Sequence, residues 1–226
     1  MGNETKIGGV LSRFGIDESY KAPSVIMNIL FDKMKREDLF KELLNAHDYD
    51  VSYDWFYEYF QDEHSDRKKK KQDFTPKCVA DLLSQLSMAG DGNPGNYYEC
   101  CAGTGGIAIK HWDNFRRKHS PFTYKPHLHF AFLEELSDRT IPFLLLNMMI
   151  RGMNGVVLHC DTLRRNCKAA YFVCNIADDH MGFSGISLFP HTKEVEELLN
   201  VKFICEQPME HKELMAIERI ELLCEC

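Results

Sequence analysis

The chain has 226 residues, of which 44% are hydrophobic and 27% are charged, and its formal net charge is −7. This composition is typical of a globular protein long enough to bury a core, and the negative charge argues against a general electrostatic attraction to nucleic acid. No apolar run approaches the roughly 20 residues needed to span a bilayer.

The N-terminus and the cysteines both indicate a cytoplasmic protein. Residues 1–9, MGNETKIGG, lack the charged-then-apolar pattern of a secretory signal. We therefore expect the nine cysteines to be reduced and mostly buried as small apolar residues. Because the chain has no Cys-x-x-Cys pair, we expect no structural zinc site and no other metal.

Residues 1–71 are predicted to form an N-terminal helical segment that ends in a basic loop. Apolar residues recur every three or four positions from Ala22 to Asn45, and the polar run 36–38 predicts a break between two helices.

Two charged stretches follow these helices. Residues 48–66 mix aromatic with acidic side chains, which we interpret as a helix packed on the core with a solvated acidic face. The alternative is a surface that imitates the charge of DNA or grips a basic partner. The run 67–71, RKKKK, is typical of an exposed loop, with contact to phosphates as the alternative.

Residues 72–226 are predicted to form a second unit in which strands alternate with helices. Thr75-Pro76 is a good helix opening, with Thr as the cap and Pro at the first helical position. A strand then ends at Glu99, and a glycine-rich turn, Gly103-Thr104-Gly105-Gly106, leads into a helix whose first N–H groups can face a ligand. Further strands are predicted to end at Glu134-Glu135, at Cys160-Asp161 and at Asn175.

This alternation predicts a parallel sheet with crossover helices, in which ligands bind beyond the carboxyl ends of the strands. We therefore expect Glu99, the glycine turn, Glu135, Asp161 and Asn175 to converge. A short helix at 193–199, a strand at 201–205 and a last helix–strand unit are expected to close a shortened sheet, with no room for a domain that reads DNA sequence.

Five elements between Gln72 and Asn175 occur in the order and spacing found in one family of DNA-modifying enzymes. They are Gln72-Asp73-Phe74-Thr75-Pro76, the turn from Glu99 to Gly106, the element from Glu134 to Thr140, Asn147 with Gly152, and Cys160-Asp161-Thr162-Leu163. With these elements the chain resembles the DNA adenine-N6 methyltransferases, specifically the modification subunits of type I restriction–modification systems. The resemblance implies a class I S-adenosylmethionine-dependent methyltransferase (Rossmann-like) α/β sheet.

The resemblance also implies a site for S-adenosyl-L-methionine. The glycine turn would hold the methionine part, Glu135 the ribose hydroxyls and Asp161 the exocyclic amine of the adenine, so binding should collapse in Glu135→Ala and in Asp161→Ala. The implied cofactor-binding residues are Phe74, Thr75, Pro76, Glu99, Ala102, Gly103, Thr104, Gly105, Gly106, Glu135, Asp161 and Leu163.

The catalytic element of the family is matched only in part. Family members carry Asn-Pro-Pro-aromatic after the fourth strand, where the Asn and a prolyl carbonyl hold the target amine and the ring stacks on a flipped-out adenine. Here the tetrapeptide is Asn175-Ile176-Ala177-Asp178, so the candidate catalytic Asn175 is kept while both prolines and the ring are missing.

Three functions are compatible with this pattern. The first is a DNA adenine-N6 methyltransferase-like protein that binds the cofactor but is weak or inactive in methyl transfer, with DNA or restriction–modification subunits as partners. The second is an active small methyltransferase that works with a separate specificity protein. The third is a methyltransferase for another amine, with Asp178 as a polar contact.

Overall fold

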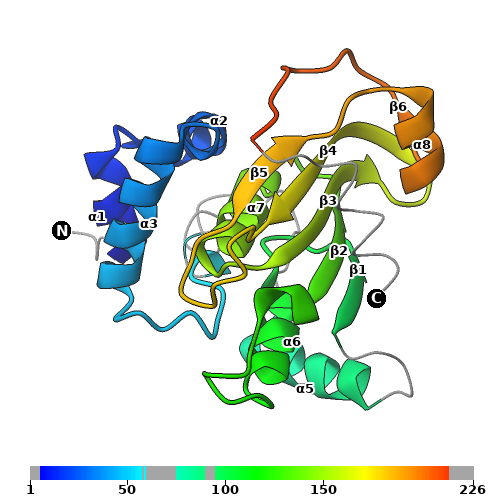
Figure 1. The fold of residues 1–226 in the computed structure, drawn as a ribbon. Helices are drawn as coiled ribbons and strands as arrows, with labels where there is room; N and C mark the ends of the chain where they lie inside the picture. Colours follow the sequence, from blue (N-terminus) through cyan, green and yellow to red (C-terminus); the bar gives the residue numbers. More distant parts are fainter. Residues whose placement is uncertain (1–5, 58, 60–74, 90–94, 214–226) are drawn as a thin grey trace.

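The computed structural model describes residues 6–57, 59, 75–89 and 95–213. These residues form an open, mixed sheet with helices on both faces (Figure 1), an α/β arrangement compatible with a Rossmann-like fold. Among the described helices, none combines the length and apolarity required to cross a membrane.

The N-terminal segment forms three helices that lie outside the sheet. They are α1 (Lys6–Arg13), α2 (Ala22–Leu30) and α3 (Lys33–Ala46), with a short 3-10 turn, η1 (Ser19–Lys21), before α2. The predicted break at 36–38 is wrong, because α3 begins just after Asp32. The Asp32 carboxylate accepts a hydrogen bond from the Lys35 amide at 3.2 Å, which is the standard way to satisfy a helix start.

The acidic and aromatic stretch is not helical from residue 48. Asp48 and Tyr49 both have positive φ angles, 54° and 59°, and residues 50–54 are irregular, so a helix starting here is a wrong prediction. Helical geometry begins at Phe56. The remainder of this predicted helix, apart from Tyr57 and Tyr59, and the basic run 67–71 lie outside the described residues.

Helix α5 (Lys77–Met88) packs on α6 (Gly106–Arg116) through small residues. The N-cap residue of α5 is Pro76, whereas the sequence predicts Thr75 as the cap. Ala80 and Ser84 are buried, whereas the apolar residues that predict this helix lie on its exposed side. The small side chains let the two helix backbones approach closely.

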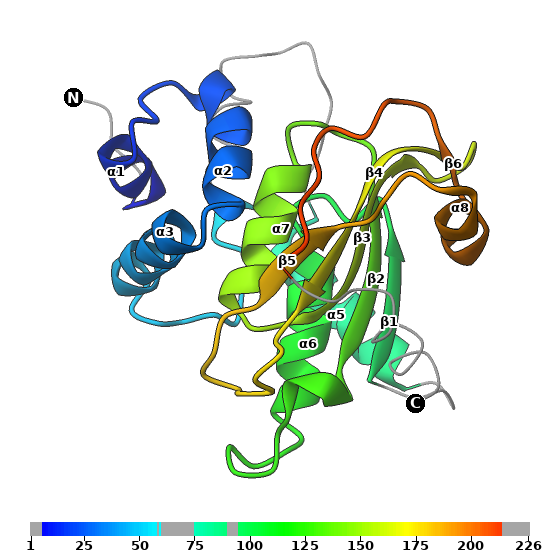
Figure 2. The same cartoon turned by 45° about the horizontal axis from the view of Figure 1, so that its top comes forward.

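Three parallel strands carry the candidate site. They are β1 (Asn96–Cys100), β2 (Phe130–Glu135) and β3 (Asn154–Asp161), paired in the order β1-β2-β3. Helix α6 and the 3-10 turn η2 (Pro126–Leu128) connect β1 to β2, and the fully buried helix α7 (Ile141–Ile150) connects β2 to β3. Figure 2 shows α2 and α3 stacked outside α7 on one face of the sheet.

The next strands run differently from the prediction. Strand β4 (Asn166–Cys174) pairs antiparallel with β3, and β5 (Gly185–Leu188) pairs antiparallel with β4. Residues 162–165 are too few for a crossover helix, so the chain must turn back as a hairpin. The predicted parallel fourth strand is therefore wrong. Helix α8 (Lys193–Leu199) matches its prediction and covers the other face of the sheet (Figure 2), and β6 (Lys202–Phe203) is shorter than predicted.

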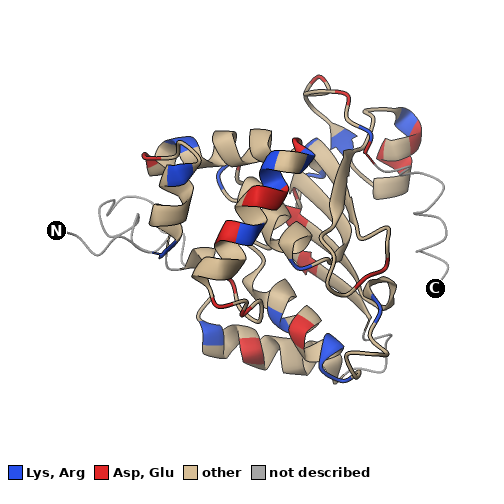
Figure 3. Cartoon of the chain, turned by 60° about the vertical axis from the view of Figure 1, so that its left-hand side comes forward, with Lys and Arg blue, Asp and Glu red and all other residues tan. Residues whose placement is uncertain are grey.

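The charged residues on α3 are of both signs. Lys33, Lys35, Arg36 and Lys41 alternate along the helix with Glu37, Asp38 and Glu42, as the blue and red segments of Figure 3 show. A mixed-sign helix does not create the strong field of one sign that steers charged partners.

Candidate functional site

A cavity of about 910 Å³ lies at the carboxyl ends of β1 and β2. Its walls come from the glycine turn, the start of α5 and α6, and the segment that follows α3. Seven of the predicted cofactor-binding residues line it: Thr75, Glu99, Ala102, Gly103, Thr104, Gly106 and Glu135. Gly105 belongs to the same turn and Pro76 adjoins Thr75, although neither lines the cavity, and Phe74 lies outside the described residues.

The glycine turn has a backbone that only glycine adopts easily. Gly103 and Gly105 have φ angles of 59° and 93°, in the left-handed region that side chains disfavour. A Cβ atom on Gly105 would also come within 2.9 Å of a Leu144 methyl group. The turn therefore needs glycine for its shape, and it delivers the N-terminus of α6 to the cavity.

Glu135 holds the turn in place from the end of β2. One of its carboxylate oxygens accepts the Gly103 amide at 2.7 Å, and the other accepts the Ser137 amide at 2.8 Å. The residue is 8% exposed. Since each carboxylate oxygen can accept two hydrogen bonds, both oxygens keep capacity for a ligand hydroxyl in the cavity.

Glu99, at the end of β1, is a carboxyl group in an unusual state. Burial raises the pKa of Glu99 to about 8, and the charge of Glu135 acts in the same direction. The Tyr97 hydroxyl donates to Glu99 at 3.1 Å, which partly offsets that shift. At neutral pH this side chain is mostly protonated, so a cation placed beside it would favour release of its proton.

The sequence prediction missed the residue that lies beneath the turn. Asp54 is in the irregular segment after α3, and its carboxylate accepts hydrogen bonds from the Asn147 side chain at 2.9 Å, from the Phe56 amide at 3.0 Å and from the Thr104 hydroxyl. Burial raises the pKa of Asp54. Asn147 also donates to the Thr104 carbonyl at 2.7 Å, so α7, the turn and residues 51–57 (the arm) share one buried network.

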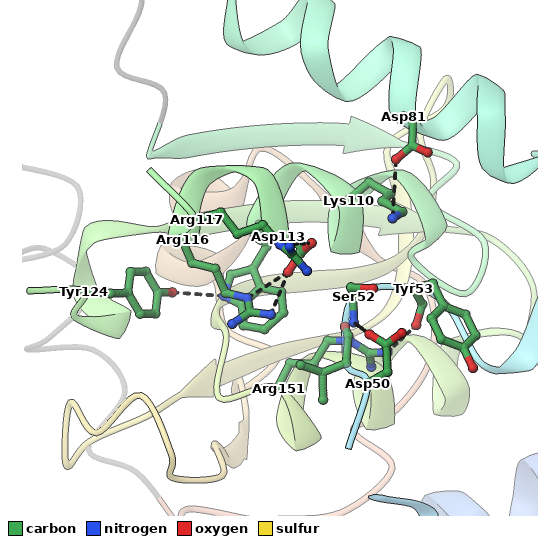
Figure 4. Close-up of polar contacts among 12 residues, drawn as sticks. Asp50, Ser52, Tyr53, Asp81, Lys110, Asp113, Arg116, Arg117, Tyr124 and Arg151 are labelled. Atoms are coloured by element: carbon green, nitrogen blue, oxygen red, sulfur yellow. Dashed lines mark hydrogen bonds and ion pairs between the residues drawn. The ribbon is translucent and has the colours of Figure 1, made fainter. Parts of the chain in front are cut away.

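Arg151 fastens the arm to the C-terminal end of α7. Its guanidinium donates to the carbonyls of Val51 at 2.9 Å and Tyr53 at 2.6 Å, and to the Asn147 side chain at 2.7 Å. The same group stacks on Trp55, 4.8 Å from the ring centroid. Figure 4 shows Arg151 directed toward the backbone of Tyr53. Burial lowers the pKa of Arg151 to about 10, and the charge of Asp54 opposes this shift.

The arm and two lysines complete the cavity wall. Tyr53, Trp55 and Tyr57 line it from the arm, and Lys77 and Lys110 line it from α5 and α6. Lys110 lies 3.3 Å from Asp81 (Figure 4). The density of aromatic residues in this stretch was the available sequence signal, but it gave no indication of which residue would face the glycine turn.

Two predicted cofactor residues are not brought to the cavity. Asp161 caps the β3–β4 hairpin turn, where its carboxylate accepts the amides of Leu163 and Arg164 at 3.0 Å each. Leu163 is 95% exposed in the same turn. Neither residue lines the cavity, because both project from a tight turn beyond the third strand.

Asn175 lies at the other end of the sheet. Because β4 is antiparallel to β3, its carboxyl end adjoins the amino end of β3, roughly 20 Å along the strands from the cavity. There the backbone N–H of Asn175 donates to the Asn154 side-chain oxygen at 2.7 Å, and the Asn175 side-chain amide donates to the Asp179 carbonyl at 2.7 Å. The predicted convergence of Asn175 with the glycine turn is therefore wrong.

The described residues contain no cluster of His, Cys, Asp or Glu side chains suited to a metal ion.

Searches of protein-family models, of curated proteins and of solved structures found nothing that matches this chain.

Proposed function

We propose that the cavity binds S-adenosylmethionine, and that the chain is a DNA adenine-N6 methyltransferase-like protein that does not transfer methyl groups through Asn175. The observation that carries this proposal is the shared cavity of the glycine turn, Glu99 and Glu135. These are the elements that the resemblance assigns to the methionine and ribose parts of the cofactor.

The chemistry of the lining residues supports a ligand of this kind. S-adenosylmethionine carries an ammonium, a sulfonium, a carboxylate and two ribose hydroxyls. Glu135 can accept from hydroxyls, and the amides at the start of α6 and Lys77 or Lys110 suit a carboxylate. Glu99, whose pKa is raised to about 8 by burial, suits the ammonium, because a neighbouring cation stabilises the ionised carboxylate.

The distance to Asn175 is the reason for proposing binding without turnover. A target amine must lie within contact of both the methyl donor and the group that orients it. Asn175 is a strand length away, and its side chain is engaged by the Asp179 and Gly182 carbonyls at 2.7 and 3.2 Å.

Isothermal titration calorimetry with S-adenosylmethionine tests the proposal. Binding should be lost, or weakened by about two orders of magnitude, in Glu135→Ala, which removes about 2–3 kcal/mol of charge-assisted hydrogen bonding. Asp161→Ala is the matched control, since it removes an acid from a turn outside the cavity, and it should bind as the unmodified chain does. Equal affinity in all three proteins would contradict the site.

The same titration in buffers of different ionisation enthalpy should show a proton released on binding near pH 7, with Glu99 as its source. Glu99→Gln should abolish that release. Labelled methyl transfer to duplex and single-stranded DNA should stay at background, and incorporation that disappears in Asn175→Ala would overturn the proposal in favour of an active methyltransferase.

A further inference from the structure

We propose that Cys100 and Cys101 form a thiol-modification site at the mouth of the cavity, where a low-molecular-weight disulfide attaches and obstructs ligand entry. The modification site stands on the two thiols alone, and only its effect on cofactor affinity rests on the proposed function.

The two thiols differ from the three cysteines inside the sheet. Both are free, both are exposed and both line the cavity. By contrast, Cys160, Cys167 and Cys174 are buried within the sheet and have no path to a bulky reagent. Exposure and position therefore single out these two consecutive residues as the thiols that a reagent can reach at the cavity.

The backbone explains why two adjacent side chains can share this location. Cys100 is the last residue of β1 and projects to the same side as the exposed Tyr98, because side chains alternate along a strand. Cys101 then adopts a φ of 62°, which is uncommon for a residue with a side chain. This left-handed residue turns the chain toward Gly103 and keeps its thiol beside that of Cys100, whose proximity contributes to the raised pKa of Cys101.

The reaction is a thiol–disulfide exchange. A thiolate of the pair attacks one sulfur of the small disulfide, a new protein–sulfur bond to that sulfur forms, and the S–S bond of the reagent breaks to release one thiolate, which takes up the proton. Burial raises the pKa of Cys101, and the charges of Cys100, Glu135 and Glu134 add to the shift. Its thiolate fraction is therefore low at neutral pH, so attachment should speed up as the pH rises.

The consequence follows from where the adduct would lie. A tripeptide-sized group on either sulfur starts at the residues that precede the glycine turn, within the same cavity as Gly103 and Glu135. It would occupy space that a ligand needs, and reduction would remove it. The cavity would then be open in the reduced protein and obstructed in the oxidised one.

The experiment uses the full chain and oxidised glutathione as the probe. Peptide mass spectrometry should locate one glutathione on residue 100 or 101, and the double variant C100S/C101S should lack it. The matched control is C78S/C205S, which removes two other exposed thiols that do not line the cavity; it should be modified like the unmodified chain. Circular dichroism establishes that each variant is folded.

Calorimetry before and after modification measures the effect. The adduct should weaken S-adenosylmethionine binding by about tenfold or more, with recovery in dithiothreitol. The oxidised-to-reduced affinity ratio should be one in C100S/C101S. Attachment confined to residues 78 and 205, or an adduct on the pair that leaves affinity unchanged, would overturn the inference.

A failure of the proposed function would look different, because the reduced protein itself would not bind the cofactor. In that case hydrogen exchange of residues 102–106 provides the second readout. The adduct should slow exchange there in the unmodified chain and in C78S/C205S, and an unchanged rate would reject obstruction of the cavity.

Discussion

The two ends of the parallel strands use similar polar residues for different purposes. At the carboxyl end, Glu99 and Glu135 border a cavity, and their carboxylates keep hydrogen-bonding capacity toward it. At the amino end, Asn175 is 4% exposed and its donors are engaged by the surrounding chain. Polar groups at one end are available to a ligand, whereas those at the other end stabilise a loop.

Gly152 illustrates how closely the amino end is packed. It follows α7 with a φ of 64°, and a Cβ atom there would come within 2.5 Å of the Gly182 carbonyl and 2.8 Å of the Asn175 side chain. The loop around Asn175 therefore has a structural role that its position in a family motif did not reveal. Strand direction decides which end of the sheet a residue serves.

The largest effect is expected from Asp54→Ala at the cavity end. The change leaves the Thr104 hydroxyl without its acceptor and removes one of the two acceptors of the Asn147 side-chain amide in a buried network, which should cost about 3–5 kcal/mol of unfolding free energy. Urea denaturation measures it. Asp50→Ala, in the same stretch but exposed, is the control and should cost less than about 1 kcal/mol. Equal losses would remove the distinction between the buried Asp54 and the exposed Asp50.

A second prediction concerns acid sensitivity at the amino end. His129 precedes β2 and its ring nitrogen lies 3.1 Å from that of His111 on α6. Burial lowers the pKa of His129 to about 3 and that of His111 to about 4. The unfolded chain therefore binds more protons, so stability is full above about pH 6.5 and falls as the pH drops toward these values.

Between about pH 7 and pH 4.5 each of the two rings should contribute a loss of about 2.5 kcal/mol, measured by urea denaturation at each pH. His129→Gln should remove the share of this loss that comes from His129, whereas His180→Gln, in the exposed loop beyond Asn175, should leave the whole dependence in place. A slope that survives His129→Gln unchanged would assign the acid sensitivity elsewhere.

The third prediction separates stability from binding. Asn175→Ala should lower the unfolding free energy by about 2 kcal/mol, because the Asp179 and Gly182 carbonyls lose the side-chain amide that donates to them. Its affinity for S-adenosylmethionine should be unchanged. Glu135→Ala should instead act mainly on binding, and its effect on S-adenosylmethionine affinity should be larger than that of Asn175→Ala. A loss of affinity in Asn175→Ala would mean that the two ends are coupled.

Glu99 should give a smaller effect of opposite sign at the cavity end. Its folded pKa of about 8 lies above the unfolded value, so the folded state holds the proton and stability declines as the pH rises through this window. From about pH 6 to pH 8 we expect a loss of about 2 kcal/mol, which Glu99→Gln should remove. Thermal denaturation across this range measures it, and a rise in stability with pH would contradict the assignment.

The smallest effect is expected at Leu163, which the resemblance placed in the cofactor site. The side chain is 95% exposed, so Leu163→Ser should change stability by less than about 0.5 kcal/mol and leave cofactor affinity unchanged. Calorimetry measures the affinity for S-adenosylmethionine, and a clearly weaker affinity would show that the β3–β4 turn takes part in cofactor binding.

The parts of the fold that could be predicted from the sequence are those that local pattern determines. The strands ending at Glu99 and Glu135, the glycine turn between them and helix α8 are specified by local pattern, and these predictions agree with the structure. The direction of β4 depends on the length of the connection, and β3 and β4 both extend further than their apolar cores indicate. A shorter connection makes a hairpin where a crossover was expected.

The arm could not be predicted for a different reason. Whether an aspartate in an acidic stretch is solvated or buried depends on the partners that tertiary folding brings to it. For Asp54 those partners, Thr104 and Asn147, are 50 and 93 positions away along the chain. No periodicity within residues 48–66 carries that information.

The place of β1 in the strand order has a consequence for dynamics. Among the described strands it pairs only with β2, so the glycine turn is carried by the outermost member of the sheet. Outer strands open to solvent at lower free energy than central ones. A ligand that bridges the start of α6 and Glu135 would stabilise this edge of the sheet. Hydrogen-exchange protection of the β1 amides would therefore report ligand binding more sensitively than the melting temperature of the whole chain.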